Sequence, residues 1–193
     1  MNWFALEHGP AAYRADFALY GIASAAMAFV LLRYSPSGTG IALLLWALAG
    51  GGGWTLVEYV LHRFVLHGLA PFNRWHAEHH SRPGALIASP TLFSASLFLA
   101  LAVMPAWWLL GAWPACALTF GLVTGYLAYG LMHHATHHPL PWLKGRSAWL
   151  TRRRRWHAMH HGAASSGGKI KQGHFGVSSG LWDYVFRTSH CQP

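Results

Sequence analysis

Four long apolar segments constrain the fold of this chain more than any other feature of its sequence. They are residues 17–32, 41–60, 86–110 and 112–132. A transmembrane helix takes about 20 mainly apolar residues, and helices satisfy their backbone hydrogen bonds internally, as a bilayer requires. The pattern therefore predicts an all-α integral membrane protein with four transmembrane helices, formed as a single domain over residues 1–193.

The charge balance supports a membrane rather than nucleic acid as the partner. Only 10% of the residues are charged and 53% are hydrophobic, which leaves too few charges for an ordinary soluble surface. Lys and Arg number 14 against 5 Asp and Glu. In a soluble protein this excess suggests nucleic acid binding, but beside apolar segments it is typical of loops that flank a bilayer.

The basic residues also predict the orientation. With four crossings, both termini and the loop between the second and third spans lie on one side of the membrane. That side receives every Lys and Arg except Arg33. Because cytoplasmic loops carry an excess of Lys and Arg, we expect a multi-pass protein with both termini and the central loop in the cytoplasm.

Histidine is the unusual residue, with 15 in the chain. The segments "WHAEHH" (75–80) and "WHAMHH" (156–161) repeat one His-x-x-His-His spacing. In an α-helix, positions i, i+3 and i+4 share one face, as do His133 and His137. His62 and His67 are five apart, about 140° around a helix, so they reach one centre only near a helix end or bend, or else two centres.

Counting these imidazoles predicts how many metal ions they hold. One ion accepts four to six ligands, so ten imidazoles fit two ions, with five around each or a few left to support the others. Neutral imidazole suits iron, zinc, copper or nickel, while a purely structural zinc site is disfavoured because it closes with four ligands. We therefore predict a cytosolic helical cap with a di-metal site and chemistry on a lipid. The candidate ligands are His62, His67, His76, His79, His80, His133, His137, His157, His160 and His161.

Two charged features flank these motifs. Glu58 lies one turn before His62 and is the only acid in the predicted spans; such an acid is usually functional, and we expect it to orient a ligand imidazole. Residues 152–155 are four consecutive arginines. Contact with lipid phosphate is the simplest interpretation, and an anionic substrate head or a docking patch for an electron donor are the alternatives.

The motifs, taken in order, resemble those of the fatty acid hydroxylase superfamily, over about residues 54–188. "WTLVEYVLHRFVLH" is close to the opening box of the fatty acid 2-hydroxylases, and "GYLAYGLMHHATHH" resembles their third box. "WHAMHH" and "FGVSSGLWDYVFRT" resemble their closing box and C-terminal signature. We thus expect histidine boxes over residues 62–161 and a signature over residues 174–188. Sterol desaturases and carotenoid hydroxylases are related branches.

The resemblance implies a non-haem di-iron monooxygenase that uses O2 to hydroxylate a lipid C–H bond, most simply at the 2-position of a fatty acyl chain. It implies two iron ions, which zinc can replace, and an external cytochrome b5- or ferredoxin-like electron donor. It implies no catalytic residues beyond the metal ligands. The candidates to support those ligands are Glu58, His134, His138, His174 and Asp183.

Two alternatives stay open at this point. Neighbouring branches with similar boxes hydroxylate or desaturate carotenoids or sterols. A metal transporter or metal-binding membrane protein is an alternative of another class, but transport needs ligands or acids deep within the spans. Glu58 is the only candidate there, which disfavours transport.

Overall fold

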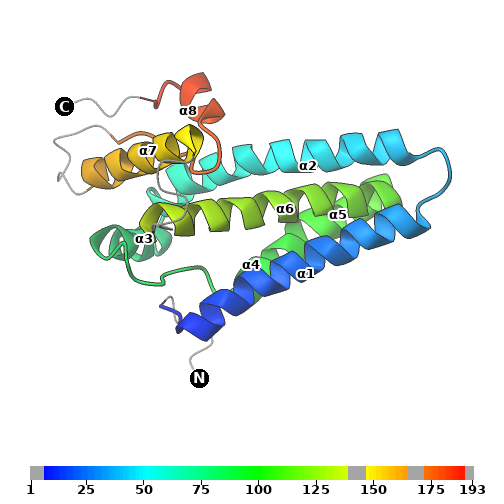
Figure 1. Cartoon of the computed structure of the whole chain (residues 1–193), viewed down its shortest axis with the longest axis horizontal. Helices are drawn as coiled ribbons and strands as arrows, with labels where there is room; N and C mark the ends of the chain where they lie inside the picture. The colour runs from blue at the N-terminus through cyan, green and yellow to red at the C-terminus, as the bar shows by residue number, and fades with distance from the viewer. Residues whose placement is uncertain (1–6, 139–146, 165–171, 190–193) are drawn as a thin grey trace. The chain divides into compact units, whose positions relative to one another are not determined.

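The computed structural model describes residues 7–138, 147–164 and 172–189, and nearly all of the regular structure in them is helical (Figure 1). Lys144, Arg146, Lys169 and Lys171, which entered the predicted charge asymmetry, lie outside the described residues. The helices are α1 (Pro10–Tyr34), α2 (Gly40–Val60), the π-helical turn η1 (Leu61–Leu66), α3 (Phe72–Ser81), α4 (Thr91–Phe98), the π-helical turn η2 (Leu99–Val103), α5 (Met104–Leu110), α6 (Ala112–His137), α7 (Ala148–Ala164) and α8 (Leu181–Val185).

The prediction of four membrane-spanning helices is confirmed. The helical segments Pro10–Tyr34, Gly40–Leu66, Thr91–Leu110 and Ala112–His137 are long and apolar enough to cross a bilayer. Large apolar side chains on them lie open, including Leu32 at 88%, Trp108 at 86% and Leu109 at 82% exposure. Such exposure is costly in water and suits contact with lipid.

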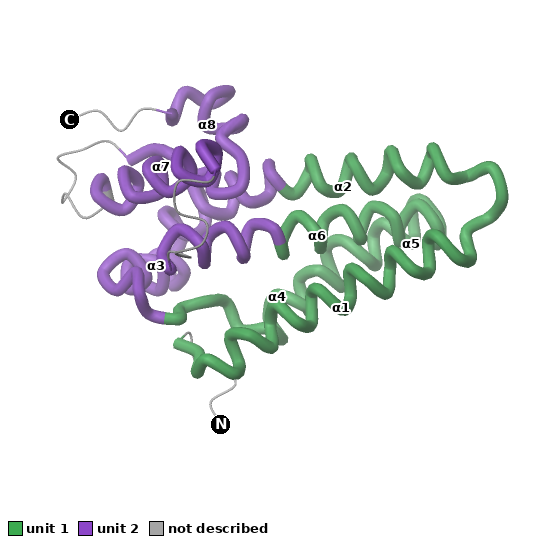
Figure 2. Tube along the Cα trace, in the orientation of Figure 1, with its two compact units in different colours: residues 1–54, 86–127 green, residues 55–85, 128–193 purple. Residues whose placement is uncertain are grey.

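The chain divides into two compact units (Figure 2). Unit 1 comprises residues 1–54 and 86–127, and unit 2 comprises residues 55–85 and 128–193. Both α2 and α6 begin in unit 1 and end in unit 2. That the whole chain acts as one domain stays a prediction.

Aromatic side chains from four helices pack together in unit 1. The ring of Tyr126 on α6 lies 4.7 Å from Tyr20 of α1 and 5.2 Å from Trp54 of α2, centroid to centroid. Phe98 of α4 stacks on Trp54 at 5.8 Å. Edge-to-face and stacked pairs at these separations stabilise packing beyond simple burial. The Tyr20 hydroxyl also hydrogen-bonds Ser94 Oγ at 2.7 Å.

Glycine allows α2 and α6 to approach closely in unit 1. A Cβ atom added to Gly50 would collide with the carbonyl oxygen of Leu118, and one added to Gly121 would collide with that of Ala47. Gly52 and Gly53, in the same run of four glycines, have nothing within 4 Å of an added Cβ. Only part of the glycine run therefore serves helix packing.

The third span begins five residues later than the predicted start at residue 86. Leu86 accepts a hydrogen bond from the amide of His8, and Ile87 forms a β-bridge with Glu7. Pro90 has a ψ of 134° and precedes the first helical residue. The residue before it, Ser89, is disfavoured from the α conformation by the proline ring, so the helix does not extend back toward residue 86. Pro105 follows the turn η2 within the span.

Candidate metal centre

A π-helical turn brings His62 and His67 to one side of their helix. The amide of His67 donates to the carbonyl oxygen of His62 at 3.2 Å, an i to i−5 hydrogen bond, and the two ring centroids lie 5.2 Å apart. In an α-helix the two side chains would diverge by about 140°. π turns are rare in proteins and, where they occur, often lie at functional sites. This one supplies the local bend that the five-residue spacing needs.

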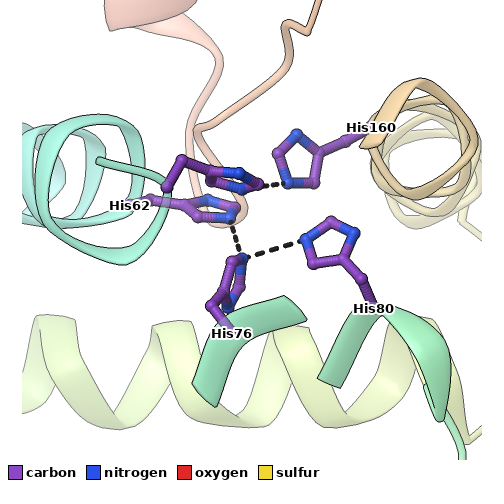
Figure 3. A group of neighbouring side chains, drawn as sticks. His62, His76, His80 and His160 are labelled. Carbon is purple, nitrogen blue, oxygen red and sulfur yellow. Dashed lines mark hydrogen bonds between the residues drawn. The ribbon is translucent and has the colours of Figure 1, made fainter. Parts of the chain in front are cut away.

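Five imidazoles of unit 2 form a first group. One ring nitrogen from each lies within 4.8 Å of those of all the others. His76 Nε2 is 3.0 Å from the Nε2 atoms of both His62 and His80. Figure 3 shows the rings of His62, His76, His80 and His160 turned toward a common space. The members of group 1 are His62, His67, His76, His80 and His160.

Five other imidazoles form a second group with the same spread of 4.8 Å. His157 Nε2 lies 2.8 Å from His137 Nε2 and 3.1 Å from His161 Nε2. The two groups adjoin, since the rings of His80 and His161 stack with centroids 4.0 Å apart. The members of group 2 are His79, His133, His137, His157 and His161.

The repeated His-x-x-His-His motif divides between the groups in opposite ways. On α3, the i and i+4 residues His76 and His80 join group 1, while the i+3 residue His79 joins group 2. On α7, the i and i+4 residues His157 and His161 join group 2, while His160 joins group 1. Each motif therefore serves both groups, and the two helices together supply six of the ten imidazoles.

The donor arrangement fits two metal ions. His62 Nδ1 donates to the carbonyl of Phe175, so in a neutral ring its Nε2 carries a lone pair toward His76. With metal–nitrogen bonds of about 2.1 Å, ligands at right angles lie about 3.0 Å apart, against about 3.4 Å in a tetrahedron. The shortest Nε2 separations, 2.8 to 3.1 Å, and the spread of 4.8 Å within each group are compatible with five nitrogens around one ion.

Burial keeps these imidazoles in the neutral form that binds metal. Removal from water, followed by repulsion from His161, lowers the pKa of His79 to about 4. Burial likewise lowers the pKa of His160 to about 3 and that of His161 to about 4. His79 is 4% exposed, and neither ring nitrogen has a hydrogen-bond partner within the described part of the chain. Such an orphaned ring is expected of a metal ligand.

A loop spanning residues 173–178 supports group 1 from behind. Its carbonyl groups accept hydrogen bonds from two rings: Gly173 from His160 Nδ1 at 2.8 Å, and Phe175 from His62 Nδ1 at 2.5 Å. Such bonds fix the tautomer and orientation of a ligand imidazole. Each group also has rings whose Nδ1 atom has no partner among the residues described: His80 in group 1, and His79 and His157 in group 2.

Two buried carboxylates hold the amides of this same loop. Asp183 accepts from the amides of Phe175 and Gly176, each at 2.8 Å, and burial raises its pKa. Glu58 accepts from the amides of Val177 and Ser178 and from the Ser178 hydroxyl. The expectation that Glu58 binds an imidazole directly needs correction, because its hydrogen bonds with described residues go to this loop.

Three other predicted supporting residues lie outside both groups. His134 and His138 stack on one another with ring centroids 4.5 Å apart. His174 stacks on Trp156 at 5.1 Å, and its φ is 55°. Sequence reasoning missed the carbonyls of Gly173 and Phe175, because any residue type offers a carbonyl oxygen. The C-terminal signature marked the segment but gave no reason for its role.

Comparisons with known proteins match most of the chain. Residues 47–188 match the model of the family described as fatty acid hydroxylase. "Dihydroceramide fatty acyl 2-hydroxylase FAH2" of Arabidopsis thaliana is 32% identical over 149 residues, covering 70% of this chain and 56% of that protein. "Fatty acid 2-hydroxylase" of Rattus norvegicus is 31% identical over 146 residues, covering 70% of this chain and 37% of that protein.

A solved structure supports the fold. The chain matches "Full length scs7p (only hydroxylase domain visible)" with a TM-score of 0.72 and 24% identity, covering 92% of this chain and 66% of that one. The chain thus spans about half or less of the length of the two curated relatives it matches.

Proposed function

This chain belongs to the fatty acid hydroxylase family, and from that premise we propose that it is a membrane-bound di-iron oxygenase that hydroxylates a fatty acyl chain, most simply at carbon 2. The division of each His-x-x-His-His motif between two five-imidazole groups carries the proposal. A mononuclear site would not need both helices to supply both groups. The names of the matched 2-hydroxylases support the position of attack.

In the proposed reaction, the ten imidazoles of groups 1 and 2 hold the two ions. Iron bound there would supply the redox chemistry that activates O2 toward a C–H bond of the acyl chain. Overall, the C–H bond, O2, two electrons and two protons give an alcohol and water, so an external donor must deliver the electrons. The chain's own residues hold the site: burial keeps the rings neutral, and the carbonyls of Gly173 and Phe175 orient two of them.

We propose further that both termini and the metal centre face the cytoplasm. The distribution of Lys and Arg supports this orientation, since a four-span arrangement leaves only Arg33 on the opposite side. A cytoplasmic site gives access to a cytochrome b5- or ferredoxin-like donor. We also propose that the two units act together as one domain.

The decisive experiment is expression in a lipid-producing host under 18O2. The expected result is a new lipid pool that carries one 18O atom on carbon 2 of an acyl chain, located by tandem mass spectrometry. The variant His79→Ala should abolish it, whereas His8→Ala, in unit 1, should not. Labelled carotenoid or sterol without labelled acyl chains would refute the assigned substrate. Absence of label from every lipid, with two metals bound, would refute the oxygenase proposal.

A further inference from the structure

The four consecutive arginines of α7 do different things. Arg153 is buried at 5% exposure and points its Nη1 toward the carbonyl of Gly176 at 3.5 Å. Arg154 donates from Nε and Nη2 to the carbonyl of Ala135 at 2.9 and 2.8 Å. Arg152 and Arg155 are exposed and, three residues apart, share a helix face. Two arginines thus brace the unit, and two are open to a ligand.

Arg152 and Arg155 line a hollow of about 540 Å³ in unit 2. Trp156 forms part of its wall, with the Arg152 guanidinium 5.5 Å from the Trp156 ring. Thr151, His174 and Ser189 are its other polar lining residues. Ser189 also lines a second hollow of about 440 Å³ together with the exposed Arg187. Three exposed arginines therefore line two hollows that share Ser189.

Unit 2 has no spare acid to neutralise these arginines. The chain has five acids, of which Glu58, Glu78 and Asp183 belong to unit 2. Glu58 and Asp183 are buried and hold the amides of residues 175–178. Glu78 forms an ion pair with Arg82. The open guanidinium groups consequently call for an anion from outside the unit.

Exposed apolar side chains beside the hollows indicate what carries that anion. Tyr184 is 78% exposed and Val185 is 51% exposed, and both line the smaller hollow. Leu181 and Phe186, next to them on and after α8, are 54% and 48% exposed. Open aromatic and aliphatic side chains alongside arginine are typical of a surface at the membrane–water interface.

We propose that Arg152, Arg155 and Arg187 bind the phosphate of a phospholipid headgroup, while Tyr184, Val185 and Phe186 contact the lipid below it. Guanidinium groups bind phosphate oxygens through paired, charge-assisted hydrogen bonds, and the Ser189 hydroxyl adds a neutral donor. The site is distinct from both imidazole groups, so its test reads lipid binding and does not depend on the proposed reaction.

The test is native mass spectrometry of the purified full chain in detergent, with phosphatidylglycerol and phosphatidylcholine added in turn. The wild type should retain phosphatidylglycerol preferentially. The double variant Arg152→Ala/Arg155→Ala should lose about 30-fold in affinity, as expected when two arginines at an anionic lipid surface are removed. The control Arg33→Ala/Arg74→Ala removes the same charge from exposed positions elsewhere and should retain the lipid.

A further variant distinguishes a specific phosphate site from general electrostatic attraction between the protein and anionic lipid. The variant Arg152→Lys/Arg155→Lys keeps the charge without the guanidinium fork, and it should bind more weakly than the wild type but above the alanine variant. Unchanged metal content in each variant shows that the fold is intact. Equal losses in the control pair, or unchanged retention in the alanine variant, would overturn the proposal.

Two competition experiments distinguish a lipid headgroup from free phosphate and from an acidic protein partner. Inorganic phosphate that displaces the lipid at equal concentration would show a site for the free anion and overturn the lipid assignment. Loss of binding to an acidic cytochrome b5-like protein in the alanine variant, with lipid retention unchanged, would reassign the surface to donor docking.

Discussion

The Nδ1 atom of His62 donates a hydrogen bond to the carbonyl oxygen of Phe175, a residue 113 positions further along the chain. The amide of Phe175 in turn donates to Asp183. The carbonyl of Phe175 shares a peptide group with the amide of Gly176, and that amide also donates to Asp183. Through these contacts the closing signature sets the orientation of an imidazole in the first histidine box, although neither segment is near the other in sequence.

Substitution of Asp183 should weaken metal binding in group 1. Asp183→Asn replaces a carboxylate oxygen that accepts a hydrogen bond from a backbone amide with an NH2 group that cannot accept one. The loop carbonyls that face His62 and His160 then lose their fixed position. Loss of such support typically costs 10- to 100-fold in metal affinity. We expect metal content to fall from two ions to one per chain after dialysis against a weak chelator, measured by plasma mass spectrometry.

Glu7→Gln, an acid substitution in unit 1, is the control and should keep two ions. Retention of both ions by Asp183→Asn under the same dialysis would show that the loop does not support group 1.

The two imidazole groups should be separable by mutation. His76→Ala removes a group 1 member, whose Nε2 lies 3.0 Å from two neighbours, and His137→Ala removes a group 2 member. Each variant should lose about one metal ion, because a site that keeps four of its five imidazole ligands binds metal less tightly. His138→Ala changes the residue next to His137 but lies outside both groups and should keep two ions. A single ion in the wild type would contradict the two-site assignment.

Acid should destabilise the metal-free protein over a defined pH range. The folded-state pKa values of His79 and His161, about 4, lie below the unfolded value of about 6.5. The unfolded chain therefore binds more protons between these values, so stability falls as pH drops from 6.5 toward 4 and is insensitive to these groups above 6.5. The thermal unfolding temperature of chelator-treated protein, measured from pH 8 to pH 4.5, checks this sign.

The same protons compete with metal for the ring nitrogens. Metal-loaded protein should accordingly hold its ions down to a pH of about 4, where the folded rings begin to take up protons, and release them below it. A stability profile that is flat between pH 6.5 and pH 4.5, or that rises toward acid, would refute the neutral state assigned to the rings.

The contact between α2 and α6 should be sensitive to a single methyl group. Gly121→Ala places a Cβ against the carbonyl of Ala47, and overpacking of this kind costs about 1–3 kcal/mol. We expect a lower thermal unfolding temperature in detergent. Gly53→Ala, in α2, adds a Cβ that meets nothing within 4 Å. This substitution should be neutral or stabilising by up to about 1 kcal/mol. Equal effects of the two substitutions would argue against close packing there.

Local spacing predicted much of this molecule. The four spans follow from the apolar segments, and the i, i+3 and i+4 rule selected eight of the ten imidazoles that the structure gathers into two groups. The other two, His62 and His67, are five residues apart and are brought together by the π turn. The group that each ring joins depends on the neighbouring helices. The spacing of histidines within one helix therefore could not predict that the motifs of α3 and α7 divide between the groups in opposite ways. The hydrogen-bond partners of Glu58 were not predicted for the same reason, since Val177 and Ser178 lie 119 and 120 residues away.

The π-helical turn at Leu61–Leu66 is matched to the residue count of the first box. It accommodates one residue more than an α-helical turn between hydrogen-bonded neighbours. Removal of a single residue between His62 and His67 would leave a spacing of four, which a regular α-helix places on one face without a π turn. Insertion of one further residue would instead turn the chain after it by about 100° relative to the chain before it. The turn thus lets a spacing of five place two rings as a spacing of four would, and it belongs to the ligand set as much as the histidines that bound it.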